Sequence, residues 1–314
     1  MAGLIARKLI ALFATLLAVA IGSFVLLDLI PGDPAINMLG TEARPDTIAA
    51  ARRLLGLDLP PFERLGVWLA GIPTGDLGVS YRYRVPVGEL IVQALAVTAP
   101  LGLYAAAITT AIGGPLALLA VLHHRRWPDV LISSTAQLGL ATPNFWVAIL
   151  LVLVFSVRLG WVEAGGFPGW AAGIGPCLRA LTLPAIALAL PQAAILLRLL
   201  RAALLETARE DYVRTARAKG LTPARVLLRH VLRNAMVPAA TMLGLQFAVL
   251  LAGSIIVENV FVLPGLGRLV FQAIQQNDLI VVRNVVLAIA AMVLVINVVT
   301  DVACAALDPR TRAR

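Results

Sequence analysis

The stretch "DYVRTARAKG" at residues 211–220, followed by "LTPARVLLRHVLRNAMVP" at 221–238, decides how the rest of the chain is interpreted. Residues 198–234 hold nine Lys and Arg against three Asp and Glu, whereas the 314-residue chain is only 14% charged and 60% hydrophobic. Soluble domains carry about a quarter charged residues. The composition therefore indicates a membrane protein with one strongly basic segment.

The local pattern of this stretch predicts two helices joined by an elbow. The nine residues before Gly220 contain no Gly or Pro, which favours a helix. Gly220 suits the left-handed position that ends a helix, and Thr222 can cap the next one with Pro223 in its first turn. A hairpin lying on anionic headgroups is the alternative. The first helix offers only one tyrosine and one valine as bulky anchors, which favours docking on a protein.

Six apolar stretches are long enough to cross a bilayer, which takes roughly 20 helical residues. They lie at 9–30, 98–122, 130–157, 181–200, 236–257 and 283–306. Pro143 predicts a tilt or kink in the third stretch, and Gly113, Gly114 and Pro115 interrupt the second. The first could instead be a cleaved signal peptide. Its apolar run continues to Ile30, which favours an uncleaved span.

The distribution of charge orients these spans. The segments 1–8, 123–129, 198–234 and the tail from Ala306 are all net positive, whereas 31–97, 158–180 and 258–282 together carry a net charge of −1. The excess of Lys and Arg on cytoplasmic loops then places both termini and 198–234 in the cytoplasm. The basic charge is thus a topology signal. No nucleic-acid-binding motif accompanies it, so nucleic acid is not an expected partner.

Motifs for chemistry are missing from the sequence. It has no G-x-x-x-x-G-K-[ST] loop for ATP and no H-E-x-x-H motif, and Cys177 and Cys304 have no metal-ligand spacing. An enzyme is therefore disfavoured, and no metal site is expected. A secondary transporter or channel not coupled to ATP is the alternative transport function. The middle of the spans is nearly free of charge, which disfavours it.

The basic stretch resembles the EAA loop of ABC-importer permeases in the dipeptide, oligopeptide and nickel branch. Five other segments resemble the B-type permease subunits of that branch: "LIPGDPA" at 29–35, "LGLDLPPFERLGVWL" at 55–69, "GDLGVSYRYRVPV" at 75–87, "VENVFVLPGLGRLVFQAIQQND" at 257–278 and "LDPRTR" at 307–312. "RHVLRNA" at 229–235 continues the loop itself. Arg283-Asn284 departs from the branch, where Gln-Gly is more usual.

The resemblance implies an all-α membrane protein with six transmembrane helices, both termini cytoplasmic, and the type I ABC importer permease fold with a cytoplasmic coupling helix. It divides the chain into a first transmembrane helix (1–30), an external, periplasmic segment (31–97), a permease core (98–306) that contains the cytoplasmic loop 198–234, and a cytoplasmic tail (307–314). Such a chain is a multi-pass protein of the bacterial inner membrane. It imports peptides or related small solutes.

The resemblance also implies the partners. They are a second, different permease subunit, two cytoplasmic ABC ATPase subunits, an extracytoplasmic substrate-binding protein, and membrane lipid. This chain would hold no cofactor, because ATP and Mg bind the ATPase subunits. The external segment, with a short amphipathic helix expected at "TIAAARRLLGL" (47–57), would serve as a platform for the binding protein. A lid over helix ends is the other interpretation.

Two groups of residues are candidates for function. The coupling group implied by the resemblance is Asp211, Tyr212, Arg214, Thr215, Ala216, Arg217, Ala218, Lys219, Gly220 and Leu221, with Ala216, Ala218 and Gly220 at close-packing positions. The candidates for the pathway or gate are Gln137, Asn144, Gln192, Gln246, Glu258, Asn259, Pro264 and Gly265. The polar ones could equally form interhelical hydrogen bonds. Glu258 could contact a substrate amine, or pair with Arg268 or Arg283.

Overall fold

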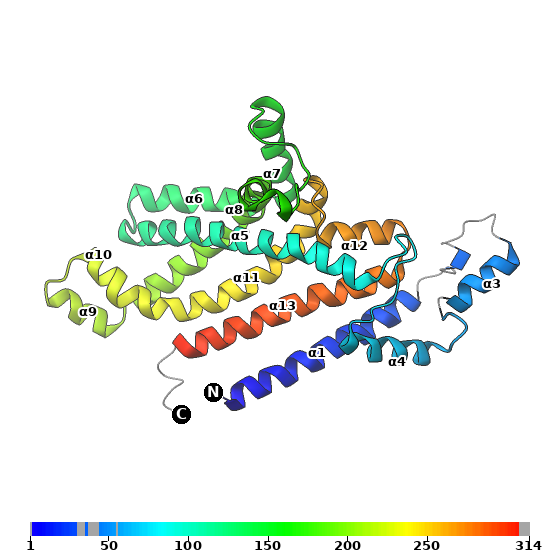
Figure 1. Ribbon diagram of the computed structural model, residues 1–314. Coiled ribbons are helices and arrows are strands. Elements are labelled where there is room, and N and C mark those ends of the chain that lie inside the picture. The colour runs from blue at the N-terminus through cyan, green and yellow to red at the C-terminus, as the bar shows by residue number, and fades with distance from the viewer. Residues whose placement is uncertain (1, 30–34, 37–43, 55, 308–314) are drawn as a thin grey trace. The chain divides into compact units, whose positions relative to one another are not determined.

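The computed structural model describes residues 2–29, 35–36, 44–54 and 56–307, which are nearly all helical (Figure 1). An isolated antiparallel bridge joins Val79 and Pro86, and no strand is named within the described residues. The chain forms two compact units, Met1–Thr98 with Pro264–Val295, and Ala99–Leu263 with Ile296–Arg314. The first and last of the quoted family-like segments lie largely outside the described residues, because 30–34 and 308–314 are not included.

The first unit is built from helices that surround a small apolar core. Its elements are α1 (Ala2–Asp28), α3 (Pro45–Leu54), α4 (Pro61–Gly71), η1 (Ile72–Thr74), the start of α5 (Val87–Leu122), α12 (Leu266–Gln275) and the first part of α13 (Leu279–Leu307). The expected helix at 47–57 is present as α3. Helix α12 was not expected. It places Leu266, Leu269, Val270 and Ala273 on one buried face, spaced as an amphipathic helix requires.

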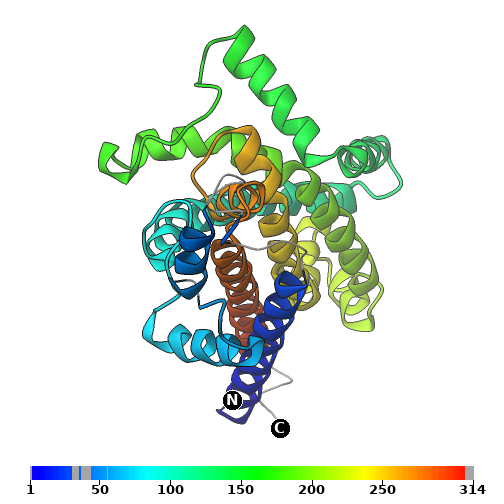
Figure 2. The same cartoon turned by 90° about the vertical axis from the view of Figure 1, so that its right-hand side faces the viewer.

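Helix α4 lies beside α1 and α13 (Figure 2), and Trp68 fixes it there. Its ring packs with Ala20 and Phe24, and its indole N–H donates to the Asn284 side-chain oxygen over 2.9 Å. The guanidinium of Arg283 lies 4.7 Å from the Trp68 ring centroid, within cation–π range. The Arg283-Asn284 pair that departs from the family pattern is therefore the pair that contacts Trp68. Helix α4 is therefore packed against α1 and α13 through Trp68.

The second unit is organised around α8 (Ile174–Thr207), which is mostly buried and contacts α6, α7 and α11. Its other elements are the inner part of α5, α6 (Trp127–Ala141), α7 (Asn144–Leu151), the π-helical η2 (Val152–Arg158), η3 (Trp170–Ala172), α9 (Asp211–Ala218), α10 (Pro223–Val226), the π-helical η4 (Leu227–Val231) and α11 (Leu232–Val260). Small residues bring the helices together. A Cβ added at Gly113 would lie 2.8 Å from the carbonyl oxygen of Ala193.

The apolar helices correspond to the expected spans, but their bounds differ. Among the described residues, four helices are long and apolar enough to cross a membrane: 6–28, 87–122, 174–207 and 279–302. The second begins at Val87, ahead of the expected 98–122, and runs unbroken through Gly113, Gly114 and Pro115. A Pro in a helix removes one backbone hydrogen bond, and apolar surroundings help to retain the rest of the helix. The expected interruption of this span is therefore wrong.

The third expected span, 130–157, is broken. Helices α6 and α7–η2 are long and apolar enough to cross a membrane only when they are taken together. They meet at an angle of 97° at Thr142–Pro143. The kink expected at Pro143 is confirmed, and it is much sharper than a tilt. The fifth expected span, 236–257, lies within α11, in which Gly244–Val260 is an apolar stretch. The described part of the chain thus contains four candidate spans, or five if the bent pair counts as one span.

Candidate functional site

The basic stretch folds as the predicted elbow (Figure 1). Helix α8 ends at Thr207, three residues turn the chain, and α9 begins at Asp211. Gly220 adopts a φ of +80°, in the left-handed region, and α10 starts at Pro223. A side chain on Gly220 would meet nothing within 4 Å, so the glycine is required by the backbone conformation. Within this chain nothing packs closely on Gly220, so its expected role as a close-packing position stays a prediction.

An apolar face anchors the elbow. Val213 and Ala216 are buried, one helical turn apart, in a cluster that also contains Leu200 and Leu204 of α8. Leu221 packs against the same cluster from after the glycine. Two of the ten coupling candidates, Ala216 and Leu221, therefore hold α9 against the rest of the unit. Burial of a valine or leucine contributes about 1.5–3 kcal/mol each, so this contact keeps α9 in one orientation.

The opposite face of α9 is exposed and cationic. The exposed candidates are Asp211, Tyr212, Arg214, Thr215, Arg217, Ala218, Lys219 and Gly220. An ion pair joins Arg214 and Asp211 at 3.5 Å, and both side chains are so exposed that it adds little to stability. Ala218 was expected to be closely packed. It lies instead on this exposed face.

Tyr212 joins α9 to the helical segment that follows Gly220, residues 223–234. Its hydroxyl accepts a 2.6 Å hydrogen bond from the Asn234 side-chain amide and lies 3.4 Å from the carbonyl oxygen of His230. Thr222 occupies the N-cap position of α10 without a side-chain capping bond, so its predicted capping is only positional. The two helical segments are therefore held by the apolar cluster and the tyrosine rather than by a cap.

Gln192 and Gln246 are brought together between α8 and α11. Both are more than nine-tenths buried, and the Gln246 amide donates to the Gln192 backbone carbonyl over 3.3 Å. The side-chain oxygens of both glutamines have no hydrogen-bond partner. A buried amide oxygen without a hydrogen-bond partner lowers the stability of the fold unless a polar group binds to it. These two candidates therefore form a polar spot inside an otherwise apolar helix contact.

The other pathway candidates do not join this spot. Gln137 is exposed on α6, and Asn144 begins α7 where its side chain lies against Gly253 of α11. Glu258 is completely buried near the end of α11, and Asn259 donates to the carbonyl of Ile255 in its own helix. In the first unit, Pro264 is exposed, whereas Gly265 is buried as the N-cap of α12. The eight candidates thus belong to several places in the fold.

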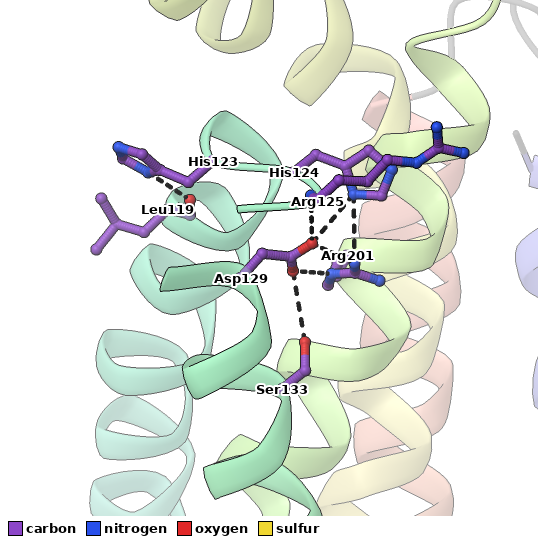
Figure 3. A network of polar contacts seen from close by, with 7 residues as sticks. All are labelled: Leu119, His123, His124, Arg125, Asp129, Ser133 and Arg201. Atoms are coloured by element: carbon purple, nitrogen blue, oxygen red, sulfur yellow. Dashed lines mark hydrogen bonds and ion pairs between the residues drawn. The ribbon is translucent and has the colours of Figure 1, made fainter. Parts of the chain in front are cut away.

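A buried ion pair that sequence reasoning missed ties the turn after α5 to α8 (Figure 3). Asp129 is 4% exposed, and its two carboxylate oxygens each accept a 2.8 Å hydrogen bond from Arg201, one from Nε and one from Nη2. The backbone N–H of Arg125 and the ring of His124 also contact the carboxylate, at 3.0 and 3.1 Å. This bidentate, buried geometry is the strong form of an ion pair.

A cavity of about 910 Å³ opens in the connection between η2 and α8. Its lining includes Trp161, Glu163, Phe167 and Arg179. Arg179 donates to the carbonyl oxygen of Trp161 over 2.5 Å, which fastens the connection to the start of α8. Aromatic, acidic and basic groups therefore share one open wall of the second unit.

Two family models match the chain. Residues 113–313 match the binding-protein-dependent transport system inner membrane component, and residues 1–102 match the N-terminal part of such membrane components. A Brucella abortus protein described as a peptide transport system permease protein is 41% identical over 312 residues, 99% of each chain. The glutathione transport system permease protein GsiC of Escherichia coli K12 is 37% identical over 306 residues, covering 98% of this chain and 97% of that one.

Solved structures share the fold at low sequence identity. The inward-facing MetNI methionine ABC transporter matches with a TM-score of 0.57 and 17% identity over 70% of this chain and 96% of that one. An amino acid ABC transporter matches with a TM-score of 0.51 and 21% identity, over 72% and 94%. The fold is that of ABC importer permease chains. The chain belongs to the family of binding-protein-dependent transport system inner membrane components.

Membership defines the general function. The chain is a transmembrane subunit of an ATP-driven, binding-protein-dependent importer in the inner membrane. Members of this family are permease subunits and are not enzymes themselves. They work with ATPase and substrate-binding partners.

Proposed function

We propose that the elbow formed by residues 211–221 is the coupling element that docks on a cytoplasmic ATPase subunit. The observation that carries this proposal is the two-sided character of α9, which is anchored through Val213 and Ala216 and exposes cations on its other face. A rigid knob can transmit a push, whereas a loose loop would absorb it. ATP and Mg stay on the ATPase subunits, and this chain holds no cofactor.

The proposed topology has six crossings with both termini in the cytoplasm. The four long helices each cross once, the bent pair α6 and α7–η2 counts as one crossing, and α11 supplies the sixth. The cationic elbow then lies inside, in keeping with the positive-inside rule. The external segment 31–97, in which Trp68 anchors α4, is proposed to face outward as the platform for the binding protein.

The proposed cargo is a peptide or a related small solute such as glutathione. The relatives named for peptide and glutathione transport align over almost their whole lengths, which supports this class. A second, different permease subunit completes the passage. The partner-free oxygens of Gln192 and Gln246 are proposed to face it, with the remaining polar candidates nearer its ends.

A cross-linking experiment tests the docking of the elbow. In a chain whose Cys177 and Cys304 are replaced by serine, cysteine is placed at Ala218 on the exposed face of α9. We expect a short bifunctional reagent to trap this cysteine with the ATPase subunit in native membranes. The matched control is a cysteine at the exposed Ala171, in the connection proposed to lie outside. Trapping at Ala171, or at neither position, would contradict the proposal.

A further inference from the structure

Apolar side chains of α6 pack against α8. Ala136 of α6 belongs to the same buried cluster as the elbow, and a Cβ on Gly139 would lie 3.2 Å from the Ala194 Cβ. Small residues let two helices approach closely, and the attraction between them is non-directional. Such a surface holds α6 beside α8 through non-directional contacts, which set no single pairing of charged groups along the helix axes.

The ion pair of Asp129 and Arg201 adds a contact of fixed distance and orientation to this apolar surface. The guanidinium holds both carboxylate oxygens at 2.8 Å, which fixes distance and orientation together. The carboxylate also accepts from the turn at Arg125, so the pair holds the turn as well as α6. Sliding by even a fraction of a helical turn would leave the buried Asp129 carboxylate without its part-buried partner, which is strongly unfavourable.

One end of this connection leads to the elbow. Arg201 lies about two turns before the end of α8 at Thr207. Leu200 and Leu204, on either side of it in sequence, pack with Val213 of α9. A displacement of the elbow is therefore delivered to the segment of α8 that carries Arg201.

At its other end, α6 leads to the bend between α6 and α7. Helix α6 ends at Ala141, the chain turns by 97° at Thr142–Pro143, and Asn144 begins α7. A rigid α6 that moves with α8 will shift this break. Without a fixed register, α8 could move while α6 and the break stay behind.

We propose that Asp129 and Arg201 are positioning residues that lock α6 to α8, so that movement of the elbow reaches the break at Thr142–Pro143. This inference rests on the proposed coupling role of the elbow. It assigns the pair to the transmission of movement rather than to assembly.

The test follows movement at both ends of the connection in the complete importer. Cysteine is placed singly at Ala218 on the elbow or at Ala141 at the end of α6, both exposed, in the chain lacking its own cysteines. Reaction with a maleimide is timed with and without ATP and vanadate. In the parent chain we expect nucleotide to change both rates. With Asp129→Asn, the change at Ala141→Cys should shrink by about fivefold or more, while the change at Ala218→Cys persists.

Matched variants separate positioning from folding. Arg198→Gln removes an exposed cation from the same helix and should leave both nucleotide-dependent changes intact. Arg201→Lys keeps a charge and loses the two-pronged geometry, so an intermediate change at Ala141→Cys is expected. If Asp129→Asn fails to assemble, the double variant Asp129→Asn/Arg201→Gln, which leaves no unpaired buried charge, is measured in its place.

The outcomes distinguish the two proposals. A nucleotide-dependent change at Ala141→Cys that survives in the pair variants would overturn the locking role, as would a parent chain in which only the elbow responds. A parent chain in which Ala218→Cys does not respond to nucleotide would overturn the coupling role of the elbow itself.

Discussion

The backbone at Gly220 has a left-handed conformation that a β-branched residue adopts only at a penalty of roughly 1–2 kcal/mol. Nothing surrounds the position, so strain rather than collision limits what can replace the glycine. We expect Gly220→Val to distort the elbow and reduce the amount of ATPase subunit that copurifies with the importer. Gly220→Asn, which tolerates this conformation, is the control and should copurify normally. Equal loss in both variants would contradict the conformational explanation.

Gln192 carries a buried side-chain oxygen without a partner, a feature that costs about 1–3 kcal/mol. We expect Gln192→Met, which has a similar volume, to raise the thermal midpoint of the purified importer and to lower its binding-protein-stimulated ATP hydrolysis. Opposite signs are expected because the proposed passage would need a polar atom whose burial destabilises the fold. Leu188→Met, at a buried apolar position of the same helix, should change neither strongly. A lowered midpoint in Gln192→Met would contradict this assignment.

Among the elements, the contact of α5 with α8 depends on one of two adjacent glycines. A Cβ at Gly113 would crowd the Ala193 carbonyl at 2.8 Å, whereas a Cβ at Gly114 meets nothing within 4 Å. Gly113→Ala should lower the free energy of unfolding by about 1–3 kcal/mol through overpacking. Gly114→Ala should be neutral or stabilising by up to about 1 kcal/mol through helix propensity. Thermal midpoints of the two variants, measured side by side, check the contrast. Equal midpoints would show that α5 can shift away from α8 without cost.

The elements that sequence reasoning found are those whose signals are local. The elbow needs only a helix without breakers, a glycine and a following proline, and all three lie within a dozen residues. The ion pair joins Asp129 to a partner 72 residues away, and one acid in a basic loop gives no sign of it. Helix α12 was not predicted for another reason. The turn residues Pro264, Gly265 and Gly267 predict a loop, and they overlap the apolar spacing that begins at Leu266.

For the whole molecule, the proposed orientation can be measured with a thiol reagent that does not cross membranes. In the chain without its own cysteines, Ala171→Cys should react in cells with a permeabilised outer membrane. Ala218→Cys should react only after the inner membrane is opened. The prediction follows from the excess of cations in 198–234. Reaction of Ala218→Cys in unopened cells would invert the topology. Reaction of both would show that the reagent had entered.

The family and the general function could be predicted from the sequence because matching segments occur along its whole length. The arrangement of the polar pathway candidates could not. Gln192 and Gln246 lie 54 residues apart and meet only because α11 packs on α8, whereas Gln137 has the same chemistry and is exposed. Polarity within an apolar helix shows that a side chain needs a partner, and only the packing of helices decides which partner is available.

The sharp bend between α6 and α7 has a consequence for how the protein is made. During synthesis the insertion machinery meets residues 127–158 as one apolar stretch with few charges, which is the signal for a single upright crossing. The finished fold requires that crossing to be split at Thr142–Pro143. We therefore expect the nascent chain to enter the bilayer straight and to acquire its bend only when α8 and α11 arrive, so that the corner is a late event in biogenesis.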